Sequence, residues 1–263
     1  MTPRIAQASQ VSLGANNSSN CSPPPPTPTP TNTPTATPTN TPTTTPTATP
    51  EICEDGVCSG QEQIIGAEQD LWCNSATGCC DQPSPILIDV LGNGFDLTDK
   101  ANGVFFSMNG GPVRLIPWTA AGSDDSWLVL DGNGNGTIDD GTELFGNFTN
   151  QPPPPEGEER NGFLALAVFD RVEVGGNNDG CIDRRDIVFG SLRLWRDGNH
   201  NGISEPQELF TLPQFGFRKM HLDYQETRVI DEHGNQFRYR AKVKDGQDAQ
   251  LGRWAWDVFL VAP

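Results

Sequence analysis

Three segments in the second half of the chain carry oxygen-bearing side chains at alternate positions, followed by a glycine and then by a carboxylate. They are loop 1 (Asp131–Glu143), loop 2 (Asn177–Asp186) and loop 3 (Asp197–Glu208). This spacing supplies ligands at positions 1, 3, 5, 9 and 12 of a calcium loop, with glycine at position 6 for the sharp turn and a backbone carbonyl at position 7. The sequence therefore predicts three calcium-binding loops, with Ca²⁺ as the cofactor.

Loop 3 fits the pattern best. Its predicted ligands are Asp197, Asn199, Asn201, the Ile203 carbonyl, Glu205 and Glu208. Glu208 is at position 12, where a carboxylate can coordinate calcium through both oxygens. Asparagine at positions 3 and 5 lowers the charge of the site, so the expected dissociation constant is on the order of 10⁻⁵–10⁻³ M, in the range of extracellular calcium modules.

Loop 1 closes one residue late, because position 12 is Thr142 and the carboxylate of Glu143 follows it. Gly141 is expected to absorb the additional residue. The predicted ligands are Asp131, Asn133, Asn135, the Thr137 carbonyl, Asp139 and Glu143.

Loop 2 departs at its start, since its first position is Gly175, which has no side-chain ligand. Asp170 is expected to reach in across the inserted stretch Arg171–Val174. The predicted ligands are Asp170, Asn177, Asp179, the Cys181 carbonyl, Asp183 and Asp186. The alternative for each loop is an Asp/Asn-rich turn without an ion. Two further segments, Asp89–Gly94 and Ser107–Gly110, look like decayed copies of these loops, but both lack ligands at needed positions, so hairpin turns are the preferred interpretation.

The flanking segments predict strands before the loops and helices after them. Apolar runs at Trp127–Leu130 and Leu192–Trp195 enter loops 1 and 3 as strands, and Phe237–Lys244 alternates with the period of a strand. Helices are expected at Thr142–Phe148, Phe163–Phe169, Arg184–Phe189 and Pro206–Leu212. The predicted fold class is α+β, with EF-hand-like strand-loop-helix calcium loops packed on an antiparallel sheet.

Composition divides the chain into three parts. Residues 1–50 are predicted to be a disordered N-terminus and a Pro/Thr-rich stalk, residues 51–83 a Cys-rich connector, and residues 84–263 the calcium-binding domain. Proline recurs every fourth residue from Pro30 to Pro50, which favours extended polyproline II. The threonines there fit either an O-glycosylated stalk or an unmodified linker.

Charge and cysteine usage narrow the function further. The formal net charge of −17 argues against nucleic acid as a partner, and no apolar run reaches the ~20 residues of a membrane helix. Five of the seven cysteines lie between Cys53 and Cys80, which favours disulfides in an oxidising compartment over a zinc site, because tight C-x-x-C pairs and a nearby histidine are lacking. Residues 1–21 lack the apolar core of a signal peptide.

Three runs of the chain carry a resemblance to a known family: Ser84–Gly94, Leu130–Gly146 and Leu192–Leu209. With them the chain resembles bacterial secreted EF-hand-domain proteins and is similar, more distantly, to the calcium-dependent self-processing module of RTX-type proteins. The resemblance covers about residues 84–263. It implies a secreted or surface-displayed bacterial protein.

The resemblance also implies an enzymatic alternative, in which an aspartate attacks its own carbonyl and cleaves an Asp-Pro bond. The matching position here is Ser84-Pro85, and the chain contains no Asp-Pro dipeptide. Serine has no carboxylate, so self-cleavage lacks its nucleophile. Motifs of other hydrolases and a phosphate loop are also missing. The sequence therefore predicts a protein that is not an enzyme.

The predicted role is that of a structural or interaction module whose fold is stabilised by calcium. A basic ladder on one predicted strand face offers a third interpretation, a glycan-binding module; its members are Arg238, Arg240, Lys242 and Lys244. The alternative is a solvated sheet face. The candidate partners besides calcium are a cell-wall glycan or another surface protein.

Overall fold

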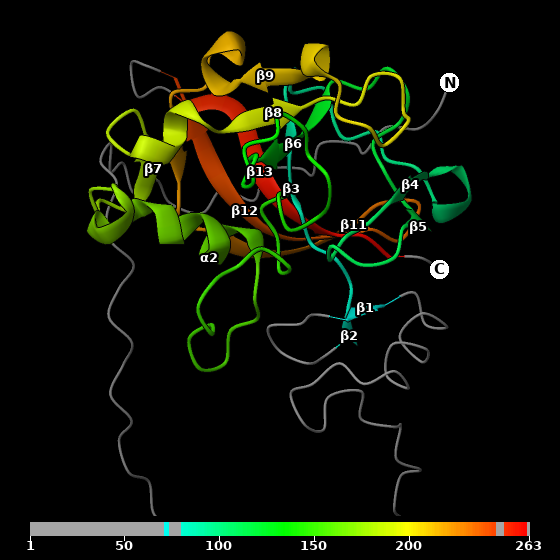
Figure 1. Cartoon of the computed structure of the whole chain (residues 1–263), viewed down its shortest axis with the longest axis horizontal. Coiled ribbons are helices and arrows are strands. Elements are labelled where there is room, and N and C mark those ends of the chain that lie inside the picture. The colour runs from blue at the N-terminus through cyan, green and yellow to red at the C-terminus, as the bar shows by residue number, and fades with distance from the viewer. Residues whose placement is uncertain (1–70, 74–79, 246–249, 262–263) are drawn as a thin grey trace, which may run out of the picture.

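The computed structural model describes residues 71–73, 80–245 and 250–261 (Figure 1). The predicted stalk at residues 1–50 and most of the predicted connector at residues 51–83 lie outside these ranges. Two described pieces of the connector form a short antiparallel pair, β1 (Trp72–Cys73) and β2 (Cys80–Asp81), in which Cys73 is opposite Cys80. Disulfide bonding of the cysteine cluster and the three-part division of the chain stay predictions.

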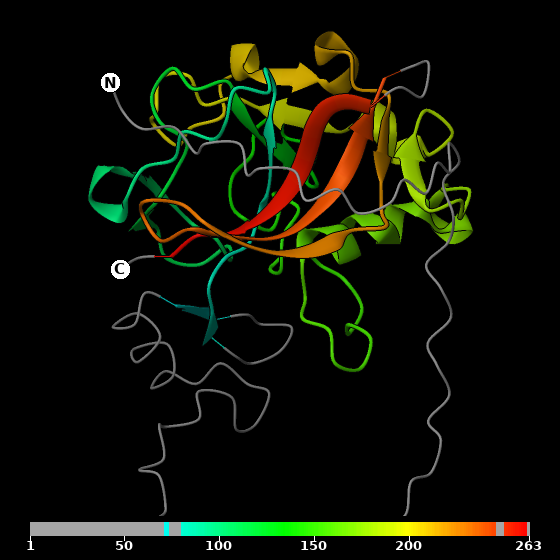
Figure 2. The same ribbon diagram turned by 180° about the vertical axis from the view of Figure 1, so that it is seen from behind.

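Loops 1, 2 and 3 project from one curled antiparallel sheet, which forms a half-barrel in Figures 1 and 2. Nine strands build it, in the order β7-β10-β12-β13-β3-β6-β8-β9, with β11 also paired to β12. Their bounds are β3 Ile86–Asp89, β6 Asp125–Val129, β7 Cys181–Asp183, β8 Arg193–Trp195, β9 Leu209–Thr211, β10 Lys219–His221, β11 Gln225–Ile230, β12 Gln236–Lys244 and β13 Gln250–Phe259.

Alternating side chains place a hydrophobic core on each face of the sheet. Leu87, Trp127 and Trp195 are register partners on β3, β6 and β8, and all three belong to one core, together with Trp118. Ile88 and Leu128 point the other way, into a second core. Because successive residues of a strand face opposite sides, a strand buried on both faces reads as a continuous apolar run, as Ile86–Ile88 does before Asp89.

One α-helix, α2 (Gly162–Ala167), lies against the second core (Figure 1). Asn161 caps it, since its side chain accepts hydrogen bonds from the amides of Phe163 and Leu164. The hairpin of β4 (Val104–Phe106) and β5 (Arg114–Ile116) borders the first core. The 3₁₀ turns are η1 Lys100–Asn102, η2 Val168–Asp170, η3 Val172–Val174, η4 Ile187–Gly190, η5 Pro206–Glu208 and η6 Leu212–Phe215.

The predicted α+β class, with helical EF-hand-like loops packed on a sheet, is wrong: the described residues are mostly β, with α2 as their only α-helix. The segment predicted as a helix after loop 1 returns to the sheet instead. Leu130 N–H donates to the Glu143 carbonyl (2.9 Å) and Phe145 N–H to the Leu128 carbonyl (3.2 Å). These backbone groups pair with the entering strand, so they are not available to an i→i−4 helix ladder.

Loop 3 shows the same arrangement, because the predicted helix Pro206–Leu212 is the short turn η5 followed by β9. Strand β9 pairs with the entering strand β8, with Leu209 opposite Trp195. After loop 2, Arg184–Phe189 holds only a turn and part of η4. Loop 3 is therefore a strand-loop-strand hairpin, whereas the chain after loop 1 returns to the entering strand β6 through an isolated bridge between Val129 and Leu144. The helix predicted at Phe163–Phe169 is present as α2 continued by η2.

Candidate functional site

The start of loop 1 is folded around the carboxylate of Asp131. Its Oδ1 accepts a hydrogen bond from the Gly134 amide (2.7 Å), and its Oδ2 accepts one from the Gly136 amide (2.8 Å). Both glycines have positive φ, 76° and 90°, which is a conformation that residues with a Cβ adopt at a cost. The sequence Asp-Gly-Asn-Gly-Asn-Gly therefore winds the backbone around a single carboxylate.

The carboxylate of Glu143 closes loop 1 from the other end. It accepts hydrogen bonds from the amides of Gly132 (2.9 Å) and Asp139 (2.8 Å). Thr142 bonds to Asp140 instead. The one-residue delay is accommodated at Gly141, where a Cβ would lie 2.4 Å from the Met108 carbonyl oxygen. Glu143, and not Thr142, therefore reaches into the loop, and its role as a calcium ligand stays a prediction.

The remaining side chains of loop 1 gather at Asp139. The amide nitrogens of Asn133 and Asn135 donate to its Oδ2, at 2.8 and 2.6 Å, and the Thr137 hydroxyl donates to its Oδ1 at 2.9 Å. These hydrogen bonds, with the one from Asn133 largest, lower the pKa of Asp139. Rotating the side-chain amide of Asn133 or Asn135 by 180° would put its oxygen where its nitrogen now lies. Both residues can therefore offer oxygen ligands to a cation without a change of the backbone.

Loop 3 repeats the frame of loop 1 on Asp197. Its carboxylate accepts from the amides of Asn201 (3.1 Å) and Gly202 (2.8 Å), while the indole Nε1–H of buried Trp118 donates to its Oδ2 (2.9 Å). Glu208 closes the loop by accepting from the Gly198 amide (3.0 Å). Loop 3 is therefore anchored to the first core through Trp118.

Loop 3 also holds two carboxylates with unsatisfied oxygens. Glu205 Oε1 accepts from Asn201 (2.9 Å) and Asn199 (3.3 Å), but no other residue donates to the buried Glu205 Oε2 and Glu208 Oε2, and only a proton on Glu208 would join the two carboxyl groups by a hydrogen bond. Burial, and then the neighbouring Glu205, raises the pKa of Glu208. Buried acceptors of this kind are rare in folded proteins and call for a donor or a cation. The Ile203 carbonyl accepts from the Glu205 amide (3.1 Å).

In loop 2, Asp170 accepts backbone hydrogen bonds in the way that Asp131 does in loop 1. Its Oδ1 accepts from the Asp179 amide (3.2 Å) and its Oδ2 from the Gly180 amide (2.8 Å). Asp170 precedes Gly180 by ten residues, whereas Asp131 precedes Gly136 by five. The structure thus brings Asp170 to the loop across the insertion; its role as a calcium ligand stays a prediction.

The rest of loop 2 is closed by Asp186 and partly neutralised by an arginine. Asp186 accepts from the amides of Asn177 (3.2 Å) and Asp183 (2.7 Å). The Arg185 guanidinium binds both oxygens of Asp183, with Nη2 2.6 Å from Oδ2, and also forms an ion pair with Asp179. The Cys181 amide donates to Asp179 (3.2 Å). Loop 2 therefore brings its own positive charge to two of its predicted ligands.

Loops 1 and 3 are in direct contact, which sequence reasoning missed. Ser204 Oγ accepts from the Ile138 amide (2.6 Å) and lies 3.4 Å from the Ile138 carbonyl oxygen. Both residues are at position 8 of their loops. The contact makes a single structural unit of the two loops, and the equal loop positions are the signal that would have indicated it.

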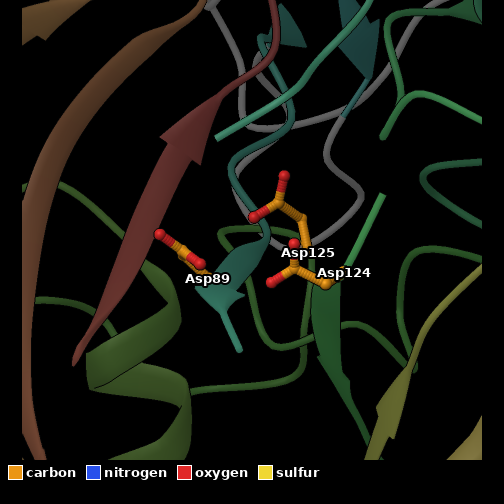
Figure 3. Close-up of side chains that lie close together, drawn as sticks. All are labelled: Asp89, Asp124 and Asp125. Atoms are coloured by element: carbon orange, nitrogen blue, oxygen red, sulfur yellow. The ribbon is translucent and has the colours of Figure 1, made fainter. Parts of the chain in front are cut away.

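A second feature that sequence reasoning missed is an acidic cluster, defined as Asp89, Asp124 and Asp125 (Figure 3). Asp89 ends β3, and Asp125, which begins β6, is its register partner. Burial raises the pKa of Asp125 to about 7, and repulsion from Asp89 and Asp124 adds to the effect, although hydrogen bonds from Asp96 and Ser123 oppose it. The signal in the sequence is the Asp89–Gly94 segment, which resembles a decayed copy of the loops but lacks ligands at needed positions.

The predicted basic ladder on β12 is engaged within the chain. The Arg238 guanidinium lies 3.9 Å from the Phe259 ring centroid and pairs with Glu159 at 3.0 Å. The Arg240 guanidinium lies over the rings of Trp254 (4.4 Å) and Trp256 (5.2 Å). Binding of a glycan by this face stays a prediction.

Comparison with known proteins places these loops in a family context. The model of a family described as the SPM domain matches residues 86–258. Over 184 residues the chain is 34% identical to the iron-regulated protein FrpA of Neisseria meningitidis serogroup C, a match that covers 68% of this chain and 15% of that protein. Both matches are consistent with the predicted RTX-related module, and neither shows an EF-hand. Among the described residues, no helix has the length and apolarity needed to cross a membrane.

Proposed function

Because this chain belongs to the SPM domain family, we propose that residues 84–263 form a calcium-dependent module of the RTX type. In this proposal the protein is secreted or displayed at the cell surface, and the Pro/Thr-rich stalk presents the module. Its role is structural or interactive, because calcium completes and stiffens the fold. The chain spans 15% of the length of its FrpA relative, so the activity and partners of that larger protein are not transferred.

The observation that carries the proposal is the pair of buried, unpartnered oxygens in loop 3, Glu205 Oε2 and Glu208 Oε2. They lie in a loop whose start and end are held by the same backbone-to-carboxylate hydrogen bonds as in loop 1. Calcium takes six to eight oxygen ligands, including carboxylates that bind through both oxygens. A calcium ion would therefore supply what these two oxygens lack.

The residues that would hold calcium are the predicted ligands of each loop. In loop 1 they are Asp131, Asn133, Asn135, the Thr137 carbonyl, Asp139 and Glu143; in loop 2 Asp170, Asn177, Asp179, the Cys181 carbonyl, Asp183 and Asp186; and in loop 3 Asp197, Asn199, Asn201, the Ile203 carbonyl, Glu205 and Glu208. All of these donors are oxygens, which suit hard cations such as calcium and disfavour zinc. The ions would also offset the repulsion in a chain of net charge −17.

The experiment is a calcium titration of the full chain after treatment with a chelator, followed by near-ultraviolet circular dichroism and calorimetry. We expect saturable binding with dissociation constants on the order of 10⁻⁵–10⁻³ M, together with a rise in melting temperature. The double variant Asp131→Asn, Asp197→Asn should lose most of both effects, whereas the exposed control Glu156→Gln should not. A wild-type protein that binds no calcium at millimolar concentration would refute the proposal.

We also propose that the module is not self-cleaving. The Ser84-Pro85 segment is held beside β13, just before the interior strand β3, because the Val258 amide donates to the Pro85 carbonyl (3.0 Å) and the Ser84 amide donates to Asn147 Oδ1 (3.0 Å). Its serine hydroxyl is not a carboxylate that could attack the adjoining carbonyl. Purified chain incubated with calcium should migrate as one band on a denaturing gel, and two calcium-dependent fragments meeting at residue 84 would overturn this part.

A further inference from the structure

We propose that the acidic cluster of Asp89, Asp124 and Asp125 is a fourth site for a hard divalent cation, separate from loops 1, 2 and 3. Each of the three residues offers a carboxylate oxygen, and these oxygens all lie within 4.8 Å of one another. Figure 3 shows the three side chains directed toward a common space from the end of β3 and the start of β6. Three carboxylates at this separation repel one another when all are ionised, and a cation between them would remove that repulsion.

The independent sign of a missing ligand is the carboxylate of Asp125. This residue is 1% exposed, and its Oδ1 is buried without a hydrogen-bond partner. Its Oδ2 is already used, because it accepts from the Asp96 amide (2.7 Å) and the Ser123 hydroxyl (2.7 Å). Leaving a buried acceptor unpaired costs about 1–3 kcal/mol, and more for a charged group. A bound cation would give Oδ1 the partner that the protein does not provide.

The backbone around Asp89 repeats the start of loop 1. Asp89 Oδ1 accepts from the Gly92 amide (2.6 Å), and its Oδ2 accepts from the Gly94 amide (2.7 Å). In loop 1, Asp131 likewise accepts from the amides of the residues three and five positions after it. The turn that looked ordinary in the sequence therefore has the frame of a calcium loop, with Asn93 at position 5.

What this turn lacks in sequence is the ligand at position 3, where Leu91 is exposed and apolar. Asp124, the residue just before β6, fills that place, since its Oδ2 accepts from the Leu91 amide (2.7 Å). Arg253 passes close to this turn, because its Cγ would lie 3.9 Å from a Cβ atom placed on Gly92. It does not direct its positive charge at the cluster. Its guanidinium lies over the Phe217 ring and donates to the Phe215 carbonyl. The site thus combines a local loop with two carboxylates supplied by β-sheet pairing.

The test counts calcium ions bound per chain by equilibrium dialysis at saturating calcium, with wild type, Asp124→Asn, Glu208→Gln and the exposed control Glu226→Gln. Asparagine keeps an acceptor for the Leu91 amide but removes the charge. We expect Asp124→Asn to bind one calcium ion fewer than wild type, Glu208→Gln also one fewer, and Glu226→Gln the same number.

The outcomes separate this site from the proposed function. If Glu208→Gln loses one ion and Asp124→Asn loses none, the fourth site is wrong and the loops stand; if wild type binds no calcium, both proposals fall. A second measurement does not depend on how the variant folds. Mn²⁺, which also prefers oxygen ligands, should broaden the Leu91 and Gly92 amide signals in the nuclear magnetic resonance spectrum of wild type, and unbroadened signals would overturn the site.

Discussion

The substitution Glu208→Gln should reverse the sign of its effect on stability when calcium is added. In the calcium-free protein, Glu208 Oε2 is buried without a partner and the side chain faces the carboxylates of Glu205 and Asp197. Glutamine keeps an oxygen for the Gly198 amide, removes one negative charge and can donate to Glu205. The variant should therefore unfold at a higher temperature than wild type in the presence of a chelator.

Two free-energy contributions set the expected shifts in melting temperature: the unpaired acceptor that the variant removes and the calcium binding that it loses. Relief of one buried unpaired acceptor is worth about 1 kcal/mol, at the low end of the usual range. In calcium at about 100 times the dissociation constant, a site stabilises the folded state by about 2.7 kcal/mol, which the variant would forfeit at loop 3. The net loss in calcium is therefore about 1.7 kcal/mol. With a shift of about 2–4 °C per kcal/mol for a domain of this size, the melting temperature should rise by about 2–4 °C in chelator and fall by about 3–7 °C in calcium.

The assay is thermal unfolding followed by circular dichroism, in excess chelator and in 100-fold saturating calcium, at one pH and ionic strength. Glu173→Gln makes the same change of charge at an exposed residue of η3 and should leave both melting temperatures close to those of wild type. The reasoning is refuted if Glu208→Gln destabilises the protein equally in both buffers, because Glu208 would then be a structural acceptor only.

Three further predictions follow from other contacts. Arg185→Gln should lower the melting temperature in chelator but tighten calcium binding at loop 2, measured by calorimetry, because Asp179 and Asp183 lose their bound guanidinium; unchanged affinity would contradict this. Ser204→Ala should remove the link to Ile138 and flatten any cooperative part of the calcium titration. Asp257 is fully buried with a pKa raised well above its usual value, mainly by desolvation. Wild type therefore loses stability as the pH rises from the unfolded pKa of about 4 toward the folded one, and Asp257→Asn should gain relative stability over that window by up to about 1.4 kcal/mol per pH unit. Chemical denaturation in chelator at several pH values tests this.

The loop frames were predictable because their chemistry is local. Asp131 and Asp197 bond to amides within five residues of themselves, and the glycines with positive φ are visible in the sequence. The role of Asp170 was also within reach, since loop 2 lacked a first carboxylate and Asp170 was the acidic residue just before the insertion.

The helices after the loops could not be excluded from sequence. Leu209–Thr211 and Gly141–Phe145 are too short for their periodicity to distinguish a strand from a helix. Their backbone partners lie on β8 and β6, and those partners exist only once the hairpin has formed. The acidic cluster was hidden for the same reason, because Asp89 and Asp125 are 36 positions apart and meet only through the pairing of β3 with β6.

The strand-loop-strand arrangement determines what calcium can do here. In a helix-loop-helix hand, ion binding can rotate an exit helix and expose a groove. In loop 3 the exit strand β9 is hydrogen-bonded to the entry strand β8, with the Arg196 amide donating to the Glu208 carbonyl (3.0 Å). A calcium ion held by Asp197 and Glu208 would join the two ends of one hairpin, and through Trp118 it would join that hairpin to the first core. Calcium would then raise the cost of opening the sheet edge without moving one element past another, which is the behaviour of a stabilised module and not of a switch.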